Sequence, residues 1–409
     1  MESISEIYRI GYGPSSSHTM GPKKAAETFL SQQPDADHYK VTLFGSLAAT
    51  GKGHLTDKAL INTFSPFPIE IDWEPSVFLP FHPNAMTFEA FDSENRQLAE
   101  WTAYSIGGGA IVDEKSSLQP RKEIIYEHQK MNEILEWCFK NGASFWEYAE
   151  AHEKEEFWDY LYQVWKVMKS AVVRGIEHEG VLPGIIHLPR KASAYYIKAK
   201  SYRGSMKRRG LAFSYALAVA EENASGGKIV TAPTCGSSGV LPAVLYVLQE
   251  THDFSEQKII RALATAGLIG NLVKKNASIS GAQVGCQGEI GTACAMASGA
   301  AAQLFGGTPY QIEYAAEMGL EHHLGLTCDP VAGLVQIPCI ERNAFAASRA
   351  LDACSFAMLS DGKHRISFDR IVNVMNQTGH DLPSIYKETS EGGLALSKAS
   401  FYKKNETNP

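Results

Sequence analysis

The sequence has neither an excess of positive charge nor a hydrophobic leader. Among its 409 residues, 45 are acidic and 38 are basic, so the formal net charge is −7. Proteins that bind nucleic acid usually carry a basic face, and this balance argues against such a partner. Residues 1–10 contain Glu2, Glu6 and Arg9 and lack the apolar stretch of a secretory signal. We therefore expect a cytoplasmic protein without a nucleic-acid partner.

Long hydrophobic runs are also scarce. The longest uncharged stretch, residues 290–312, is rich in alanine and interrupted by glycine and glutamine. It is less apolar than a membrane-spanning helix needs to be, whereas its small residues suit a tightly packed buried helix. We expect no membrane partner. Hydrophobic residues make up 44% and charged residues 20% of the chain, a composition and length sufficient for two globular domains.

Cysteine is sparse and forms no C-x-x-C pair. The seven cysteines stand at positions 138, 235, 286, 294, 328, 339 and 354. An odd number in a chain without a signal peptide disfavours a disulfide framework and fits a reducing compartment. The short-spaced pairs of structural zinc sites and ferredoxins are missing. The cysteines are thus either buried thiols or members of a metal or catalytic site.

The first part of the chain has the alternating pattern of β-strands mixed with helical segments. A helix is expected over residues 23–30, and the expected strands cover residues 39–44, 67–71, 86–91 and 98–104. We predict a small α+β domain over residues 1–115 that serves to dock the substrate.

The rest of the chain has helical periodicity. Residues 116–180 are predicted to form a helical connector whose tryptophans pack in a core, and residues 181–396 an all-α catalytic domain. A polar tail, 397–409, is predicted to be disordered. The helices expected in the second domain cover residues 211–223, 240–249, 256–275, 292–305, 311–323 and 340–355.

Three of the cysteines adjoin residues that bend the backbone. Cys286 lies between glycines in the sequence GCQG, Cys328 precedes Asp-Pro, and Cys339 follows a proline. Such bends allow three thiolates to point at a shared centre. Three thiolates on a four-iron cube would leave one iron open to act as a Lewis acid on a hydroxyl or carboxylate. Buried thiols without metal remain the alternative for these residues.

A hydroxyl-rich segment precedes the first expected helix. It contains Ser15, Ser16, Ser17, His18 and Thr19. Hydroxyls and free N–H groups at a helix start can bind an anion such as a substrate carboxylate. The alternative is a helix cap, which requires only one of the serines.

Further polar residues mark possible site positions. His54 follows the glycine-rich sequence GKG, which lets a histidine approach a ligand, and Asn276 and Ser278 precede Cys286. Because polar groups among apolar helices need partners, we predict that Asn276 and Ser278 orient thiolates and substrate. The sequence TAPTCGSSG, residues 231–239, could bind the phosphate of pyridoxal phosphate. Such a cofactor also needs a lysine to form a Schiff base, and Lys191 is the best of several poor candidates.

Several long motifs together resemble the iron–sulfur L-serine dehydratases, in the single-chain form that fuses β-type and α-type parts. The likeness extends from about residue 3 to residue 396. The motifs are GPSSSHTMGP (13–22), TAPT (231–234), NASISGAQVGCQG (276–288), EHHLGLTCDPVAG (321–333) and QIPCIERN (336–343).

The resemblance implies an enzyme with a metal cofactor. It implies an oxygen-labile [4Fe–4S] cluster whose three ligands match Cys286, Cys328 and Cys339. It also implies conversion of L-serine to pyruvate and ammonia by a homodimer. We expect the serine-rich segment to anchor the substrate and His18 or His54 to remove its Cα proton, since histidine titrates near neutrality.

Two departures from the family pattern affect these expectations. Cys235 stands where members often have asparagine, which puts the role of its loop in doubt. Residues 396–409 contain no cysteine, so we do not expect a tail thiolate to cap the open iron. A pyridoxal-phosphate serine/threonine dehydratase and a non-enzymatic amino-acid sensor are the rival interpretations.

Overall fold

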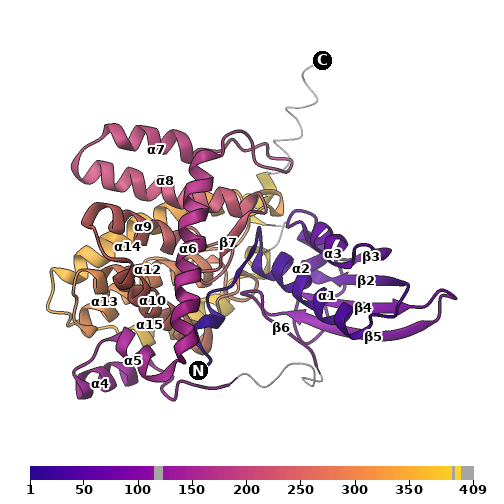
Figure 1. Ribbon diagram of the computed structural model, residues 1–409, viewed down its shortest axis with the longest axis horizontal. Coiled ribbons are helices and arrows are strands. Elements are labelled where there is room, and N and C mark those ends of the chain that lie inside the picture. The colour runs from indigo at the N-terminus through magenta and orange to yellow at the C-terminus, as the bar shows by residue number, and fades with distance from the viewer. Residues whose placement is uncertain (115–122, 389–391, 398–409) are drawn as a thin grey trace.

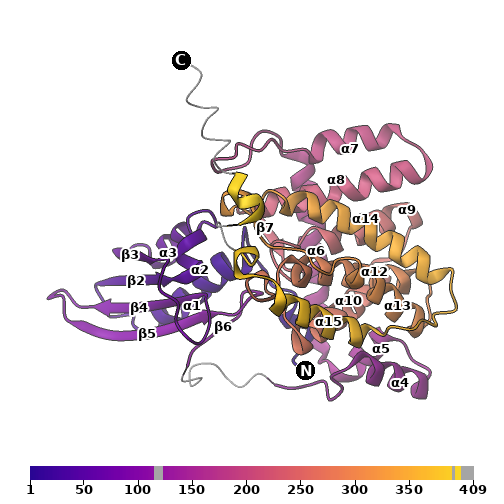
Figure 2. The same ribbon diagram turned by 180° about the vertical axis from the view of Figure 1, so that it is seen from behind.

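The computed structural model describes residues 1–114, 123–388 and 392–397, which form an α+β lobe beside a larger helical lobe (Figures 1 and 2). The α+β lobe holds a five-stranded sheet in the order β3-β2-β4-β5-β6, in which β2 is parallel to β3 and the other pairs are antiparallel. Its elements are α1 (Gly21–Gln32), β2 (His38–Phe44), α2 (Gly45–Thr50), α3 (Thr56–Phe64), β3 (Ile69–Glu74), β4 (Ala85–Phe91), β5 (Gln97–Ser105) and β6 (Ile111–Val112).

Strand alternation sets the core of this lobe. In β2, Tyr39, Val41 and Leu43 are fully buried and face α1 and α3, whereas the residues between them are half-buried. On the opposite face, Thr42 pairs in register with Thr87, whose hydroxyl lies 2.9 Å from that of Thr102. The four strands expected from the sequence correspond to β2, β3, β4 and β5 and are confirmed.

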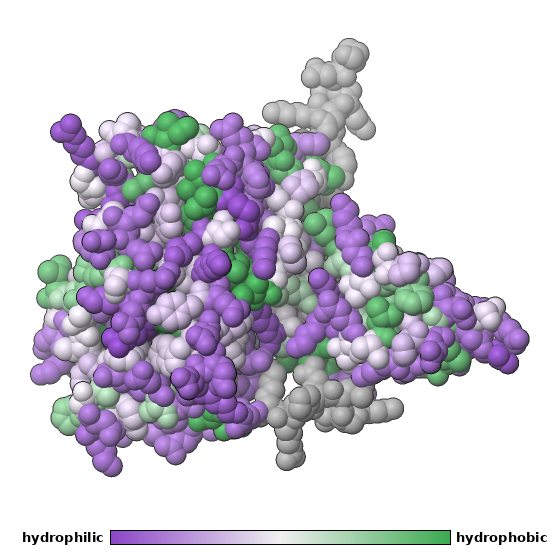
Figure 3. All heavy atoms as spheres, viewed as in Figure 1, coloured by the Kyte–Doolittle hydropathy of each residue, from purple (hydrophilic) through white to green (hydrophobic). Residues whose placement is uncertain are grey.

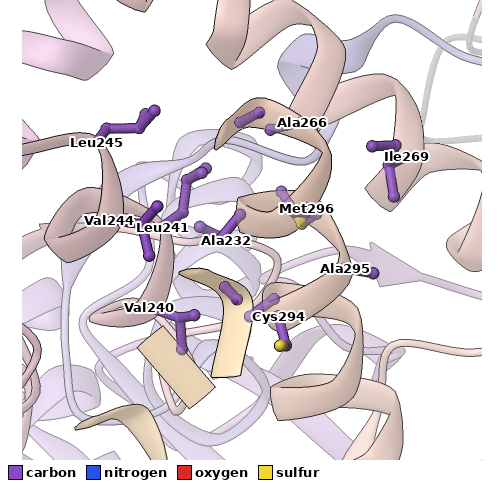
Figure 4. Packing of buried hydrophobic residues seen from close by; sticks show 14 of the residues in the cluster. Ala232, Val240, Leu241, Val244, Leu245, Ala266, Ile269, Cys294, Ala295 and Met296 are labelled. Atoms are coloured by element: carbon purple, nitrogen blue, oxygen red, sulfur yellow. The ribbon is translucent and has the colours of Figure 1, made fainter. Parts of the chain in front are cut away.

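The helical lobe surrounds α12, which packs against α9, α10, α13 and α14. Figure 4 shows Cys294 and Met296 of α12 among side chains of α9 and α10. This confirms that the alanine-rich part of the uncharged stretch, residues 292–304, is a buried helix. The helices are α4 (Met131–Asn141), α5 (Phe145–His152), α6 (Glu155–Glu177), α7 (Ala192–Ser201), α8 (Gly204–Ala224), α9 (Val240–His252), α10 (Glu256–Asn276), α11 (Gly281–Val284), α12 (Thr292–Leu304), α13 (Pro309–Glu321), α14 (Cys339–Met358) and α15 (Phe368–Asp381).

The expected fold class, an α+β part followed by a helical part, is thus confirmed, with a few differences in detail. Within the predicted helical connector, residues 116–180, the chain breaks between α5 and α6, where the Glu153 side chain accepts hydrogen bonds from the backbone N–H of Ile4 and the hydroxyl of Tyr126. Helices α7 and α15 were not anticipated. The predicted disordered tail lies, from residue 398 on, outside the described residues.

The N-terminal segment belongs structurally to the helical lobe. Strand β1 (Ile10–Tyr12) pairs antiparallel with β7 (Lys228–Val230), the short strand between α8 and α9. Before it, Ile4, Ile7 and Tyr8 are buried in the helical core, and the Tyr8 hydroxyl donates to the carbonyl of Leu263. The chain therefore starts in one lobe and crosses to the other immediately after β1.

No helix in the described part of the chain is both long and apolar enough to cross a bilayer. The face seen in Figure 3 is largely hydrophilic, with separate hydrophobic patches on both lobes.

We expect Gly267→Ala in α10 to destabilise the protein, although alanine normally favours a helix. A Cβ atom at this position would lie 1.9 Å from Cγ2 of Ile4. Overpacking of this kind costs about 1–3 kcal/mol, measurable by denaturant unfolding. Adding Ile4→Ala should relieve the clash, so the double variant should lose less than the sum of the single losses. Additive losses would contradict the packing described here.

Candidate active site

The hydroxyl-rich segment forms a π-helical turn, Ser16–Met20, that leads into α1. The Ser15 side chain caps this turn, since its oxygen accepts from the backbone N–H of His18 at 3.1 Å. Capping thus accounts for Ser15, as the simpler interpretation required. All five side chains from Ser15 to Thr19 are buried, although capping explains only one of them.

The imidazole rings of His18, which belongs to this turn, and of His54 lie side by side, with centroids 4.5 Å apart. Two threonines hold them in place: the hydroxyl of Thr19 donates to the carbonyl of His54 at 2.7 Å, and that of Thr56 donates to the carbonyl of His18. Burial lowers the pKa of His18 to about 4 and that of His54 to about 3. Both imidazoles are therefore neutral at neutral pH and able to accept a proton.

Hydrogen bonds to their neighbours fix the tautomers of the two rings. Nε2 of His18 lies 3.2 Å from the carbonyl of Ser46, so it carries the proton, and Nδ1 lies 2.9 Å from the Ser17 hydroxyl. The Thr50 hydroxyl donates its only proton to the Ser46 carbonyl, so its oxygen accepts from Nδ1–H of His54. Nε2 of His54 is then unprotonated, and no described residue donates a hydrogen bond to it.

The three predicted ligand cysteines come together from separate segments of the helical lobe. Cys286 precedes the π-helical turn Gln287–Gly291, Cys328 follows α13, and Cys339 is the first residue of α14. The thiol of Cys328 is hydrogen-bonded to Cys286, and Cys339 is near enough to interact with Cys286 electrostatically. The bends noted in the sequence thus bring these side chains to one place.

The thiols differ in acidity. The hydrogen bond from Cys328, together with the Arg342 guanidinium, lowers the pKa of Cys286. The same hydrogen bond, with burial, raises the pKa of Cys328, and burial raises that of Cys339. One thiolate is therefore already favoured, and a metal would deprotonate the other two.

This donor set fits an iron–sulfur cluster better than a single ion. The three sulfur atoms do not all lie within 4.8 Å of one another, as the ligands of a single ion would. In the described part of the chain, the one group whose ligand atoms do so is Glu127, His128 and His152. A four-iron cube binds each thiolate at a different corner and so needs a wider spacing than one ion. Three soft donors, two of them buried and all close to a guanidinium, suit an iron–sulfur cluster.

Two buried carboxylates that sequence reasoning did not single out border the cysteines. Glu289 accepts from the hydroxyl of Thr234 at 2.8 Å and lies 3.9 Å from the sulfur of Cys328. Glu388 donates its backbone N–H to the carbonyl of Cys328. Burial raises the pKa of both carboxyl groups.

Glu388 connects the two halves of the site. Its Oε1 atom lies 3.4 Å from Nδ1 of His18 and 3.5 Å from the hydroxyl of Ser17, which belong to the other lobe. Its backbone is in the left-handed region, with φ +57°. It stands in the sequence YKETSEGGLA, residues 386–395, which gave no chemical reason to single it out.

Other predicted residues lie at the edge of the site. The side chain of Asn276 donates to the carbonyls of Gln129 and Leu272, and Ser278 donates to Gln283. Among the described residues, neither is hydrogen-bonded to a cysteine or to the serine-rich turn. The thiol of Cys235 points at the sulfur of Met20, at 3.3 Å, and not at the cysteine group.

Fold and site together define a two-lobe protein whose buried centre combines imidazoles from one lobe with three thiols from the other. The sequence profile of the serine dehydratase alpha chain matches residues 92–395, and that of the beta chain matches residues 3–69 and 64–116. The chain belongs to the serine dehydratase family, with both parts fused in one polypeptide.

Relatives with the same arrangement cover nearly the whole chain. An L-serine dehydratase of Streptomyces coelicolor is 40% identical over 96% of this chain and 98% of its own length. One of Mycobacterium bovis is 41% identical over 97% and 98%, and L-serine dehydratase 1 of Escherichia coli K12 is 39% identical over 97% and 99%.

We expect the buried histidines to make folding stability depend on pH. Between the unfolded value of 6.5 and the folded values near 4 and 3, the unfolded chain binds protons that the folded chain does not. Stability should therefore decrease as the pH falls from 6.5, by about 2 kcal/mol for each histidine at pH 5. Denaturant unfolding of the wild type and of His18→Gln at pH 7 and pH 5 measures this. Equal losses in both proteins would contradict the assignment.

Proposed function

We propose that this chain is an L-serine ammonia-lyase that converts L-serine to pyruvate and ammonia. One observation carries the proposal: the serine-rich turn with its two neutral histidines meets the three-cysteine group, and Glu388 touches both. The relatives named L-serine dehydratase agree with it.

The cofactor belongs to the proposal. Cys286, Cys328 and Cys339 would hold a [4Fe–4S] cluster, with Arg342 offsetting part of its negative charge. Such a cluster, having only three cysteine ligands, supplies an open iron as a Lewis acid for the departing hydroxyl group.

Substrate recognition is assigned to the turn at the start of α1. Ser15, Ser16, Ser17, His18 and Thr19 present buried hydroxyls and backbone N–H groups suited to a carboxylate. We also assign Asn276 and Ser278 to the substrate-binding set, because they lie in the polar segment before Cys286, where the Ser278 hydroxyl accepts from the backbone N–H of Ser280 at 3.0 Å. Desolvated donors of this kind bind an anion more strongly than exposed ones.

His54 is the better of the two candidate bases. Both nitrogens of His18 have hydrogen-bond partners, whereas Nε2 of His54 accepts no hydrogen bond from any described residue. His54 would take the Cα proton, and His18 would hold the serine turn. Loss of that proton and of the β-hydroxyl gives aminoacrylate, which tautomerises to an imine and hydrolyses to pyruvate and ammonia.

Specific contacts argue against the rival enzyme. Lys191 is paired with Glu341 at 2.7 Å and is partly exposed, a poor setting for a Schiff base. The loop after β7 has the Glu289 carboxyl group against Thr234, where a phosphate would require positive charge. We also propose, on the family resemblance, that the enzyme is a cytoplasmic homodimer.

Anaerobic purification tests the cofactor. The protein should be brown, contain about four irons per chain, and lose its activity with L-serine in air. Cys286→Ala, Cys328→Ala and Cys339→Ala should each abolish the iron absorbance.

The controls for that experiment are Cys138→Ala and Cys354→Ala, which change buried thiols on α4 and α14 away from the centre. They should keep iron and activity. A colourless, air-stable and active wild type would disprove the cluster, and a yellow protein inactivated by borohydride would favour pyridoxal phosphate.

His54→Asn should reduce kcat on L-serine by roughly 10²–10⁴-fold, the usual contribution of a general base, with little change in KM or iron content. The mutated enzyme should also stop exchanging the Cα proton with solvent. His38→Asn, which changes a half-buried histidine on β2 outside the site, is the control. Retention of proton exchange in His54→Asn would exclude it as the base.

A further inference from the structure

We propose that Glu388 binds the α-ammonium group of the substrate. It would thereby select hydroxy amino acids over hydroxy acids that have no amine. This inference rests on the proposed function and adds to it the recognition of the one substrate group that is positively charged. The carboxylate end is assigned to the serine turn and the hydroxyl end to the cysteine group, which leaves the ammonium group without a partner.

The position of Glu388 is set by the loop that carries Cys328. Residues on both sides of it are fixed there: Lys387 forms a β-bridge with Cys328, and the N–H of Leu394 donates to Asp329 at 2.8 Å. A Cβ atom at Gly393 would lie 1.8 Å from that same Asp329 carboxylate, so the approach is very close. The Glu388 side chain is thereby directed from the helical lobe toward Ser17 and His18.

One oxygen of this carboxylate has no partner. Oε1 faces Ser17 and His18, and the backbone N–H of Ala282 also approaches the carboxylate, whereas Oε2 is buried and accepts no hydrogen bond from the described residues. The side chain as a whole is only 12% exposed. A buried carboxylate oxygen without a donor is costly, and a native structure that retains one usually has a use for it.

An ammonium group is the donor that this environment requires. Among the described residues no lysine or arginine forms an ion pair with Glu388, and the neighbouring His18 imidazole is neutral and supplies no positive charge. A substrate ammonium group offers three donors and a full positive charge, which satisfies both the hydrogen bond and the charge.

The other carboxylate at the centre is less suited to this role. Glu289 uses one oxygen to accept from Thr234, and its other oxygen lies against the sulfur of Cys328. Glu388 is also nearer to the imidazoles, because it contacts His18 and interacts electrostatically with His54. An ammonium group bound to Glu388 would therefore lie closer to the imidazoles than one bound to Glu289.

Equilibrium binding to the anaerobic holoenzyme tests this directly. L-Alanine and propionate differ only by the amine, and neither has a leaving group to eliminate. Calorimetry should show that Glu388→Gln weakens L-alanine binding by about tenfold or more, the value of a charge-assisted hydrogen bond. Propionate binding should stay within about twofold, and Glu388→Asp, which keeps the charge, should fall between wild type and Glu388→Gln for L-alanine.

The matched control is Glu317→Gln in α13, another buried glutamate with an oxygen that lacks a partner, outside the site. It should bind both ligands as the wild type does. Equal weakening of both ligands in Glu388→Gln, or of neither, would overturn the inference. If Glu388→Gln lacks the iron absorbance and so does not fold, the test uses Glu388→Asp. In that variant too, L-alanine binding should weaken more than propionate binding. A wild type inactive on L-serine would instead refute the proposed function.

Discussion

The pairing of β1 with β7 holds the site together. Ile10 lies opposite Val230, so the chain leaves β1 toward the serine-rich turn while β7 leads into the loop that contains Thr234. Two further hydrogen bonds hold the segment where the chain passes from one lobe to the other. The side chain of Asn223 donates to the carbonyl of Pro14 at 2.8 Å, and Arg9 donates to the carbonyl of Gly108 in the α+β lobe. Groups from both lobes are thereby buried against each other.

Burial then determines the chemistry of each group. It lowers the pKa of the two histidines and raises the pKa of Glu289, while hydrogen bonding lowers the pKa of Cys286 in spite of burial. An imidazole kept neutral and a thiol made more acidic are the forms that proton transfer and metal binding require. The same desolvation makes unsatisfied polar atoms costly, so the hydroxyls that hold the histidine carbonyls are structural necessities.

Local patterns in the sequence predicted much of this arrangement, because they depend on neighbours in the chain. Strand alternation located β2, and small residues located α12. The glycines and prolines beside Cys286, Cys328 and Cys339 indicated bends, and the structure places these cysteines together. Helix α7 was missed because its mostly exposed residues show little amphipathic pattern.

Partners distant in the chain could not be predicted in the same way. Glu388 meets Ser17 across 371 positions, and no periodic pattern records such a contact. The break at Glu153 likewise depends on its hydrogen bond to Ile4, 149 positions away. For the same reason the sequence could not predict that the side chain of Asn276 donates to the carbonyl of Gln129, 147 positions away.

Mutual dependence of the lobes bears on whether the α+β part could act alone as an amino-acid sensor. Its turn relies on the helical lobe for Asn223 at Pro14 and for Glu388 at Ser17. Separated, the α+β lobe would expose the buried carbonyl of Pro14 and leave His18 without its carboxylate neighbour. A sensor has no need for neutral imidazoles directed at a group of thiols, whereas a lyase that must remove a proton and a hydroxyl from adjacent carbons requires both lobes in contact.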